Sequence, residues 1–189
     1  SCFANCGQVC LGTERVYVER PLFDKFVAAM KERTEKLKLG APEDAATSLG
    51  PLISLEHRAK VLSYYGKAIV EGATVVTGGG APIMRGDLAG GAWVEPTIWI
   101  GLSDDAAIVT EEIFGPYTHI APFDSEDEVV KRANALDYGL SASSCTTYRS
   151  RAHRVSAQIE AGIVWVNSWF LRDLHRAFGG MKQSGSGRE

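Results

Sequence analysis

The sequence predicts an α/β protein whose mostly parallel sheet carries helices on both of its faces. Three observations support this fold class. Short apolar runs typical of strands alternate with amphipathic stretches of helical length, glycine and proline separate most of these segments, and 189 residues suffice for one domain with a buried core. Parallel strands need a crossover of about a dozen residues or more, usually a helix, so the alternation indicates a largely parallel sheet. The sequence contains no internal repeat and no linker that divides the chain.

The first half of the chain begins with a predicted strand at 13–19, where apolar residues alternate with polar or aromatic ones. Pro21 suits the first turn of a helix, and apolar residues at helical spacing follow it towards Gly40. Ser54 is a good cap for a second helix that ends before Gly72. Further strands are expected at 73–77, 93–100, 118–123, 140–146 and 163–166.

The second half contains two more predicted helices. The acidic run at 124–128 favours the N-terminus of a helix that reaches Ala135, because acidic side chains interact well with the helix dipole there. Residues 150–160 form the other helix. We expect residues 138–139 to be a turn, and the glycine-rich tail after Ser168 to be irregular.

Composition excludes several classes of protein. The chain is 45% hydrophobic and 23% charged, with a formal net charge of -3, which is an ordinary globular profile. No basic excess points to nucleic acid, and no apolar run is long enough to span a membrane. The first residues do not resemble a secretion signal, and four cysteines are too few for a disulfide scaffold. Reduced thiols and a cytoplasmic location are expected.

Cys10 is the first candidate for chemistry. It lies between Gly7 and Gly12, and these small residues allow a substrate carbonyl to approach the sulfur. A thiolate is a strong nucleophile near neutral pH, although a free cysteine can equally be a small core residue. The spacing of Cys2, Cys6 and Cys10 lacks the CxxC form of zinc sites and has no histidine nearby, so no metal is expected.

Three other segments carry polar residues in unusual settings. In the run EEIFGP, the carboxylate of Glu112 can accept bonds from a ribose, although a solvated charge pair explains the run equally well. Arg172 lies among aromatic residues and can grip a substrate carboxylate, or it can pair with Asp173. Asn167 ends a predicted buried strand, where its amide can fix neighbouring backbone.

Four stretches together resemble the aldehyde dehydrogenase superfamily. FANCGQVCLG is similar to its active-site cysteine motif, and EEIFGP is similar to the motif that follows in the catalytic domain. IEAGIVWVNSW and FGGMKQSGSGRE match its late motifs in the same order. The likeness covers essentially the whole chain. Within the superfamily, VNSWFLRDL followed by FGGMKQSG is most similar to dehydrogenases of hydroxymuconic and aminomuconic semialdehydes.

The resemblance implies a role for each matching residue. Cys10 would attack the carbon of a small aldehyde to give a thiohemiacetal and then a thioester, and its backbone amide would stabilise the oxyanion. Glu112 would hold the nicotinamide ribose of NAD, and Phe114 would pack beside the nicotinamide; NADP remains open. Asn167 would shape the substrate side of the site. Arg172 would bind the distant carboxylate of a semialdehyde such as 2-hydroxymuconic semialdehyde.

The resemblance also implies how the chain is organised. Residues 1–189 would form the cysteine-bearing catalytic segment, without the upstream NAD-binding part, which carries the general base, and without the C-terminal oligomerisation arm. We expect the segment alone to be inactive and the full-length enzyme to be a homodimer or homotetramer. Two other functions stay open: a cysteine hydrolase or acyltransferase, which needs a partner base, and a non-catalytic binding module.

Overall fold

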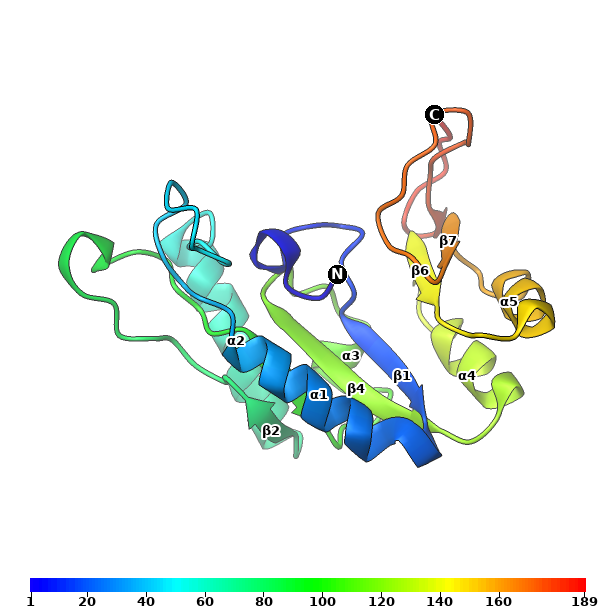
Figure 1. Ribbon diagram of the computed structural model, residues 1–189, viewed down its shortest axis with the longest axis horizontal. Helices are drawn as coiled ribbons and strands as arrows, with labels where there is room; N and C mark the ends of the chain where they lie inside the picture. Colours follow the sequence, from blue (N-terminus) through cyan, green and yellow to red (C-terminus); the bar gives the residue numbers. More distant parts are fainter. The chain divides into compact units, whose positions relative to one another are not determined.

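A four-stranded sheet with the order β1-β4-β3-β2 organises the N-terminal part of the chain (Figure 1). In this computed structural model, which describes residues 1–189, β3 and β4 are parallel and β2 is antiparallel to β3. The sheet is therefore mixed, and the α/β class predicted from the sequence is confirmed. The strands of this sheet are β1 (Arg15–Glu19), β2 (Thr74–Thr77), β3 (Thr97–Ile100) and β4 (Tyr117–Phe123).

The chain divides into two compact units, Ser1–Pro122 and Phe123–Glu189, and each is described by itself. The sequence carries no linker signal at this division. None of the helices combines the length and the apolar character that crossing a membrane requires.

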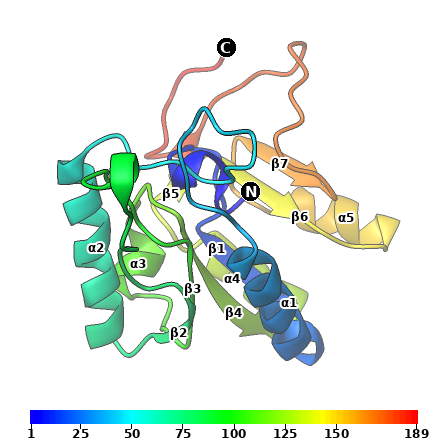
Figure 2. The same ribbon diagram turned by 60° about the vertical axis from the view of Figure 1, so that its left-hand side comes forward.

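Two helices cover opposite faces of the sheet in the first unit (Figure 2). Successive side chains of a strand point to opposite faces, so β3 contributes Trp99 to one face and Ile98 to the other. Trp99 packs in the cluster that includes buried residues of α2 (Leu55–Val70) and α3 (Ala107–Thr110). Ile98 packs in the cluster that includes residues of α1 (Phe23–Glu35). The predicted arrangement of helices on both faces is therefore present in this unit.

The first two long helices begin where the sequence predicts. The Ser54 hydroxyl caps α2 by accepting a hydrogen bond from the backbone N–H of His57 at 3.0 Å. Pro21 lies in a short 3-10 helix, η2 (Arg20–Leu22), directly before α1. α1 stops at Glu35, earlier than predicted: the backbone N–H groups of Lys36 and Leu37 bond carbonyls three residues back in a tighter last turn, and the chain then leaves the helix.

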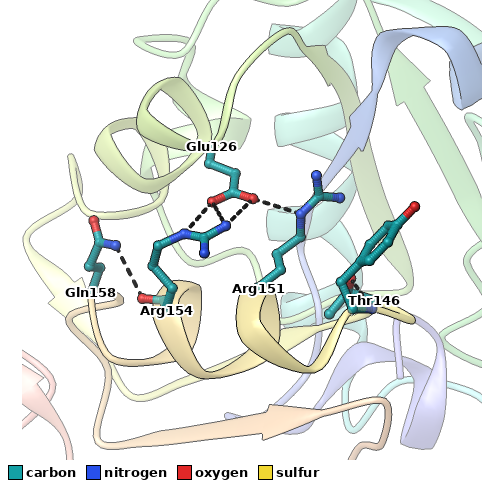
Figure 3. Close-up of polar contacts among 6 residues, drawn as sticks. Glu126, Thr146, Arg151, Arg154 and Gln158 are labelled. Atoms are coloured by element: carbon teal, nitrogen blue, oxygen red, sulfur yellow. Dashed lines mark hydrogen bonds and ion pairs between the residues drawn. The ribbon is translucent and has the colours of Figure 1, made fainter.

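The second unit contains two helices and two pairs of strands. α4 (Glu126–Ala133) and α5 (Arg149–Ser156) match the predicted helices, although α5 ends four residues before the expected Glu160. β6 (Ser141–Ser144) is parallel to β7 (Ile163–Val166). In the same unit, the carboxylate of Glu126 on α4 bonds two arginines of α5, as Figure 3 shows.

One local prediction in this unit is wrong. Tyr138–Gly139 was expected to be a turn, but these residues form β5, which pairs antiparallel with β8 (Met181–Lys182) in the tail that was expected to be irregular. Each strand has only two residues and its partner lies about forty residues away, so neither has a local pattern that indicates it.

Candidate active site

The cysteine motif folds into an unusual left-handed loop. Within η1 (Ala4–Gly7), Asn5, Cys6 and Gly7 have φ angles of 47°, 58° and 75°. Few residues other than glycine and asparagine adopt this region readily. The Asn5 carbonyl accepts the backbone N–H of Gln8 at 3.0 Å, and the Asn5 side-chain amide donates to the Gln8 carbonyl at 3.1 Å. These bonds close the loop immediately before Cys10.

Two side chains fasten this loop to the segment that precedes α2. The thiol of Cys6 is buried and donates to the carbonyl of Gly50 at 3.1 Å. Burial raises the pKa of Cys6, which keeps this thiol protonated and makes it a poor nucleophile. The side-chain oxygen of Gln8 accepts the backbone N–H of Ile53 at 3.0 Å. Cys6 is therefore a structural residue.

Cys10, in contrast, is exposed. Neither its thiol nor its backbone amide makes a hydrogen bond within the chain. The alternative that Cys10 is a core residue does not hold, because Cys10 is exposed whereas the side chains of Cys6 and Leu11 are the buried ones of this motif. The structure contains no group of three or more histidine, cysteine or acidic side chains that could hold a metal ion.

The EEIFGP run lies against the cysteine loop, backbone to backbone. A Cβ atom added to Gly7 would lie 1.8 Å from the carbonyl oxygen of Gly115, so no side chain fits between the two segments. Gly115 is also confined on its other side, where an added Cβ would meet Val61 of α2 at 2.8 Å. Two motifs separated by about a hundred residues in the sequence thus form one site.

The two adjacent carboxylates of this run have different surroundings. Glu111 accepts a short hydrogen bond from the hydroxyl of Tyr64, and this bond raises the pKa of Tyr64 to about 12. The exposed carboxylate of Glu112 has no partner within the chain. The ammonium group of Lys60 donates to the backbone carbonyl of Glu112 at 3.4 Å. The structure therefore leaves Glu112, and not Glu111, available to a ligand.

Phe114 has a left-handed φ of 62°, and two residues that the sequence did not indicate hold it. Its N–H donates to the carboxylate of Glu14 at 3.2 Å, and its carbonyl lies 2.7 Å from Nε2 of His57. Burial raises the pKa of Glu14, while the bond from the Phe114 N–H partly offsets this effect. Neither His57 nor Glu14 is among the candidates that the sequence indicates, because nothing local links either residue to position 114.

Asn167 lies in the second unit with its side chain fully engaged. Its amide oxygen accepts the backbone N–H of Thr146 at 2.8 Å, and its amide nitrogen donates to the Thr146 carbonyl at 2.9 Å. These bonds extend the pairing of β6 with β7 by one residue, although Asn167 itself is left-handed with a φ of 53°. As the sequence suggested, its amide fixes neighbouring backbone.

Arg172 follows in the exposed loop after β7. The indole N–H of Trp165 anchors this loop by donating to the Leu171 carbonyl at 2.8 Å. The guanidinium carbon of Arg172 lies 4.4 Å from the centre of the Phe178 ring. Asp173, the alternative partner, instead bonds His175 at 3.0 Å and faces Arg176 at 4.0 Å. The Arg172 guanidinium therefore rests on an aromatic ring without an acidic partner.

The whole chain matches a known protein family. The model of the aldehyde dehydrogenase family matches residues 1–189. The chain is 69% identical over 189 residues to 2-hydroxymuconic semialdehyde dehydrogenase from Pseudomonas sp. (strain CF600), covering 100% of this chain and 39% of that protein. It is 58% identical over 187 residues to 2-aminomuconic 6-semialdehyde dehydrogenase from Pseudomonas sp., covering 99% of this chain and 38% of that protein.

Solved structures give the same result. The chain superposes on the NAD+ complex of an aldehyde dehydrogenase from Bacillus cereus with a TM-score of 0.94 at 40% identity, covering 99% of this chain and 37% of that one. The chain thus spans about two fifths of the length of the relatives that it matches. The chain belongs to the aldehyde dehydrogenase family.

Proposed function

We propose that this chain is the cysteine-bearing catalytic segment of an NAD-dependent aldehyde dehydrogenase that oxidises a semialdehyde bearing a carboxylate. The observation that carries the proposal is the contact between the two motifs. The loop that presents an exposed Cys10 lies backbone to backbone against the loop that presents the unpartnered carboxylate of Glu112. A nucleophile and a candidate cofactor-binding group therefore belong to one rigid arrangement.

Cys10 acts as the nucleophile in this proposal. Its sulfur adds to the aldehyde carbon to give a thiohemiacetal, and the thioester formed on oxidation is hydrolysed to the acid. The carbonyl oxygen becomes negatively charged when the sulfur adds. The backbone amide of Cys10, which makes no hydrogen bond within the chain, is free to donate to that oxygen.

The residues around Glu112 fit a nicotinamide cofactor, which accepts a hydride when it is bound. The exposed carboxylate of Glu112 can accept hydrogen bonds from the two hydroxyls of a ribose. The half-buried ring of Phe114 offers an apolar surface beside it. The superposition on an NAD+ complex supports NAD as the cofactor of this chain too.

Arg172 is the proposed carboxylate-binding residue. Its guanidinium has no acidic partner, so both of its N–H edges are open to a carboxylate, and the aromatic ring beneath it limits the positions it can adopt. Asn167 contributes indirectly, because its bonds to Thr146 fix the start of the loop that carries Arg172. The names of two relatives, dehydrogenases of 2-hydroxymuconic and 2-aminomuconic semialdehydes, support a substrate of this class.

We also propose that the segment works within a longer polypeptide, which provides the rest of the NAD site and assembles as a homodimer or homotetramer. The lengths of the matched relatives support this view, since this chain corresponds to about two fifths of each. The term full-length enzyme below means this chain within a polypeptide of the relatives' length.

The test compares three forms of the full-length enzyme: wild type, Cys10→Ala and Cys145→Ala. Cys145 is also exposed and serves as the matched control. Wild type and Cys145→Ala should form NADH from a semialdehyde, whereas Cys10→Ala should form none. Iodoacetamide, followed by peptide mass analysis, should label Cys10 before Cys145. NAD-independent ester hydrolysis without aldehyde oxidation would favour a cysteine hydrolase, and equally slow labelling of both thiols would favour a binding module.

A further inference from the structure

The backbone of Phe114 is held on both sides of its Cα, at its N–H and at its carbonyl, by side chains from elsewhere in the first unit. The Glu14 carboxylate accepts its N–H at 3.2 Å, and Nε2 of His57 meets its carbonyl at 2.7 Å. The imidazole also lies against the Phe114 ring in an edge-to-face arrangement, with ring centres 6.4 Å apart. No other non-glycine residue of the EEIFGP run has a positive φ.

This turn requires support from its surroundings. A phenylalanine with a φ of 62° is strained, and such strain persists only where neighbouring groups determine the conformation. Gly7, Gly115 and Val61 fix the position of the loop by close packing. Packing alone does not set the orientation of the two peptide planes that flank Phe114, whereas an acceptor at its N–H orients the plane before it and a donor at its carbonyl orients the plane after it.

Glu14 is well placed to hold the loop, because its own backbone is fixed by the sheet. Its carbonyl accepts the backbone N–H of His119, a residue of β4, at 2.8 Å. Glu14 is only four residues from Cys10, so one short segment carries both the nucleophile and the acceptor for the Phe114 N–H. A half-buried carboxylate is costly unless it is well hydrogen-bonded, which argues for a specific role of Glu14.

We propose that Glu14 and His57 are positioning residues for the cofactor loop. By fixing the left-handed backbone conformation of Phe114 they set where Glu112 lies relative to Cys10, without touching substrate or cofactor themselves. The inference rests on the proposed function, in which Glu112 binds the nicotinamide ribose. It adds a cause for the position of Glu112: two side chains far from position 114 in the sequence hold the backbone of the loop that carries it.

The test uses the full-length enzyme with Glu14→Ala, Glu14→Gln, His57→Ala and the matched control Glu43→Ala, which removes an exposed carboxylate from the same unit. Two quantities are measured: the Kd for NAD, by calorimetry, and the hydrogen exchange of peptides that cover 111–116. Glu14→Ala and His57→Ala should each raise the Kd about tenfold and speed exchange in the loop, because each removes one hydrogen bond to the Phe114 peptide. Glu43→Ala should change neither quantity.

Glu14→Gln separates positioning from charge. The glutamine side chain keeps an oxygen that can accept the Phe114 N–H, so this variant should retain the wild-type Kd and exchange rate. A loss as large as that of Glu14→Ala would overturn the inference. The double variant Glu14→Ala with His57→Ala should raise the Kd by less than the product of the single effects, because both side chains hold the backbone conformation of the same residue, Phe114.

The outcomes keep this inference distinct from the proposed function. An enzyme that binds NAD but oxidises no aldehyde refutes the proposed function, and the variants still decide the role of Glu14. If the wild type does not bind NAD, hydrogen exchange of residues 111–116 is the deciding measurement. Equal exchange rates in Glu14→Ala and Glu43→Ala overturn the inference, and faster exchange in Glu14→Ala supports it. If Glu14→Ala does not fold, His57→Ala replaces it, and wild-type behaviour of that variant overturns the inference.

Discussion

Arg172 illustrates at the scale of a single residue how an exposed charge can be kept available. An arginine that is followed directly by an aspartate commonly forms a surface ion pair, but Asp173 is engaged by His175 and Arg176. The Phe178 ring instead provides a surface that orients the guanidinium and has no negative charge to satisfy it. This arrangement is what the proposed role of Arg172 in carboxylate binding requires.

Substitution of Arg172 by alanine should therefore affect one class of substrate. In the full-length enzyme, Arg172→Ala should raise the KM for a carboxylate-bearing semialdehyde about tenfold or more, because a charge-assisted contact is lost. The KM for a simple aliphatic aldehyde should hardly change. Steady-state NADH formation measures both. Arg176→Ala, which removes a neighbouring exposed arginine, is the control, and an equal loss for both substrates would make Arg172 a structural residue.

At the scale of secondary-structure elements, the second unit depends on a charged contact between two short helices. The carboxylate of Glu126, at the start of α4, accepts a hydrogen bond from Nε of Arg151 at 2.6 Å and two hydrogen bonds from Arg154 at 2.8 Å (Figure 3). Arg154 donates these two bonds through Nε and Nη2 of its guanidinium, one to each carboxylate oxygen. Neither helix contains a fully buried residue, so this contact is one of the features that hold α5 beside α4.

The contact should make the second unit sensitive to acid. The hydrogen bond from Arg154, together with Arg151, lowers the pKa of Glu126 in the folded protein. A carboxyl group with a lowered folded pKa stabilises the fold above its unfolded pKa, and this stabilisation is lost as the pH falls through the folded value. Glu126→Gln should therefore speed hydrogen exchange of residues 149–156 at neutral pH. The difference in exchange rate between this variant and wild type should shrink as the pH falls through the pKa of Glu126 in the folded protein.

Asp127→Asn provides the control for that experiment. Asp127 lies in the same first turn of α4 and has no arginine partner, so the substitution removes a charge near the helix N-terminus without breaking the contact with α5. It should leave exchange of α5 close to wild type at every pH. Equal effects of the two substitutions would assign the acid sensitivity to the helix dipole instead of the arginines.

The ends of elements show what local sequence can and cannot predict. Ser54 caps α2 as expected, because a cap needs only a hydroxyl and an N–H three residues later. The strand at Tyr138–Gly139 was missed because its definition depends on Met181–Lys182. The left-handed conformations of Phe114 and Phe170 could not be predicted from the sequence either, because nothing in a phenylalanine side chain favours a positive φ.

For the whole molecule, the central prediction concerns the segment by itself. These 189 residues should show no aldehyde-dependent NADH formation, whereas the full-length enzyme should show it. The reason is that the segment corresponds to about two fifths of its relatives, and the family resemblance places the general base in another part of the polypeptide. The measurement is NADH absorbance with saturating semialdehyde. Turnover by the segment would mean that every necessary group lies within it.

The sequence alone determined the α/β class and the family, because these depend on periodicity and on motifs read along the chain, and it singled out Cys10 as the candidate nucleophile. It also marked Glu112 and Arg172 as candidates, but it could not decide between binding and ordinary surface pairing. Only the tertiary structure decided that Cys6 is buried while Cys10 is exposed, and that Glu111 is engaged while Glu112 is free. It alone brought Glu14 to Phe114, because contacts between residues about a hundred positions apart arise from the packing of whole elements and leave no local pattern in the sequence.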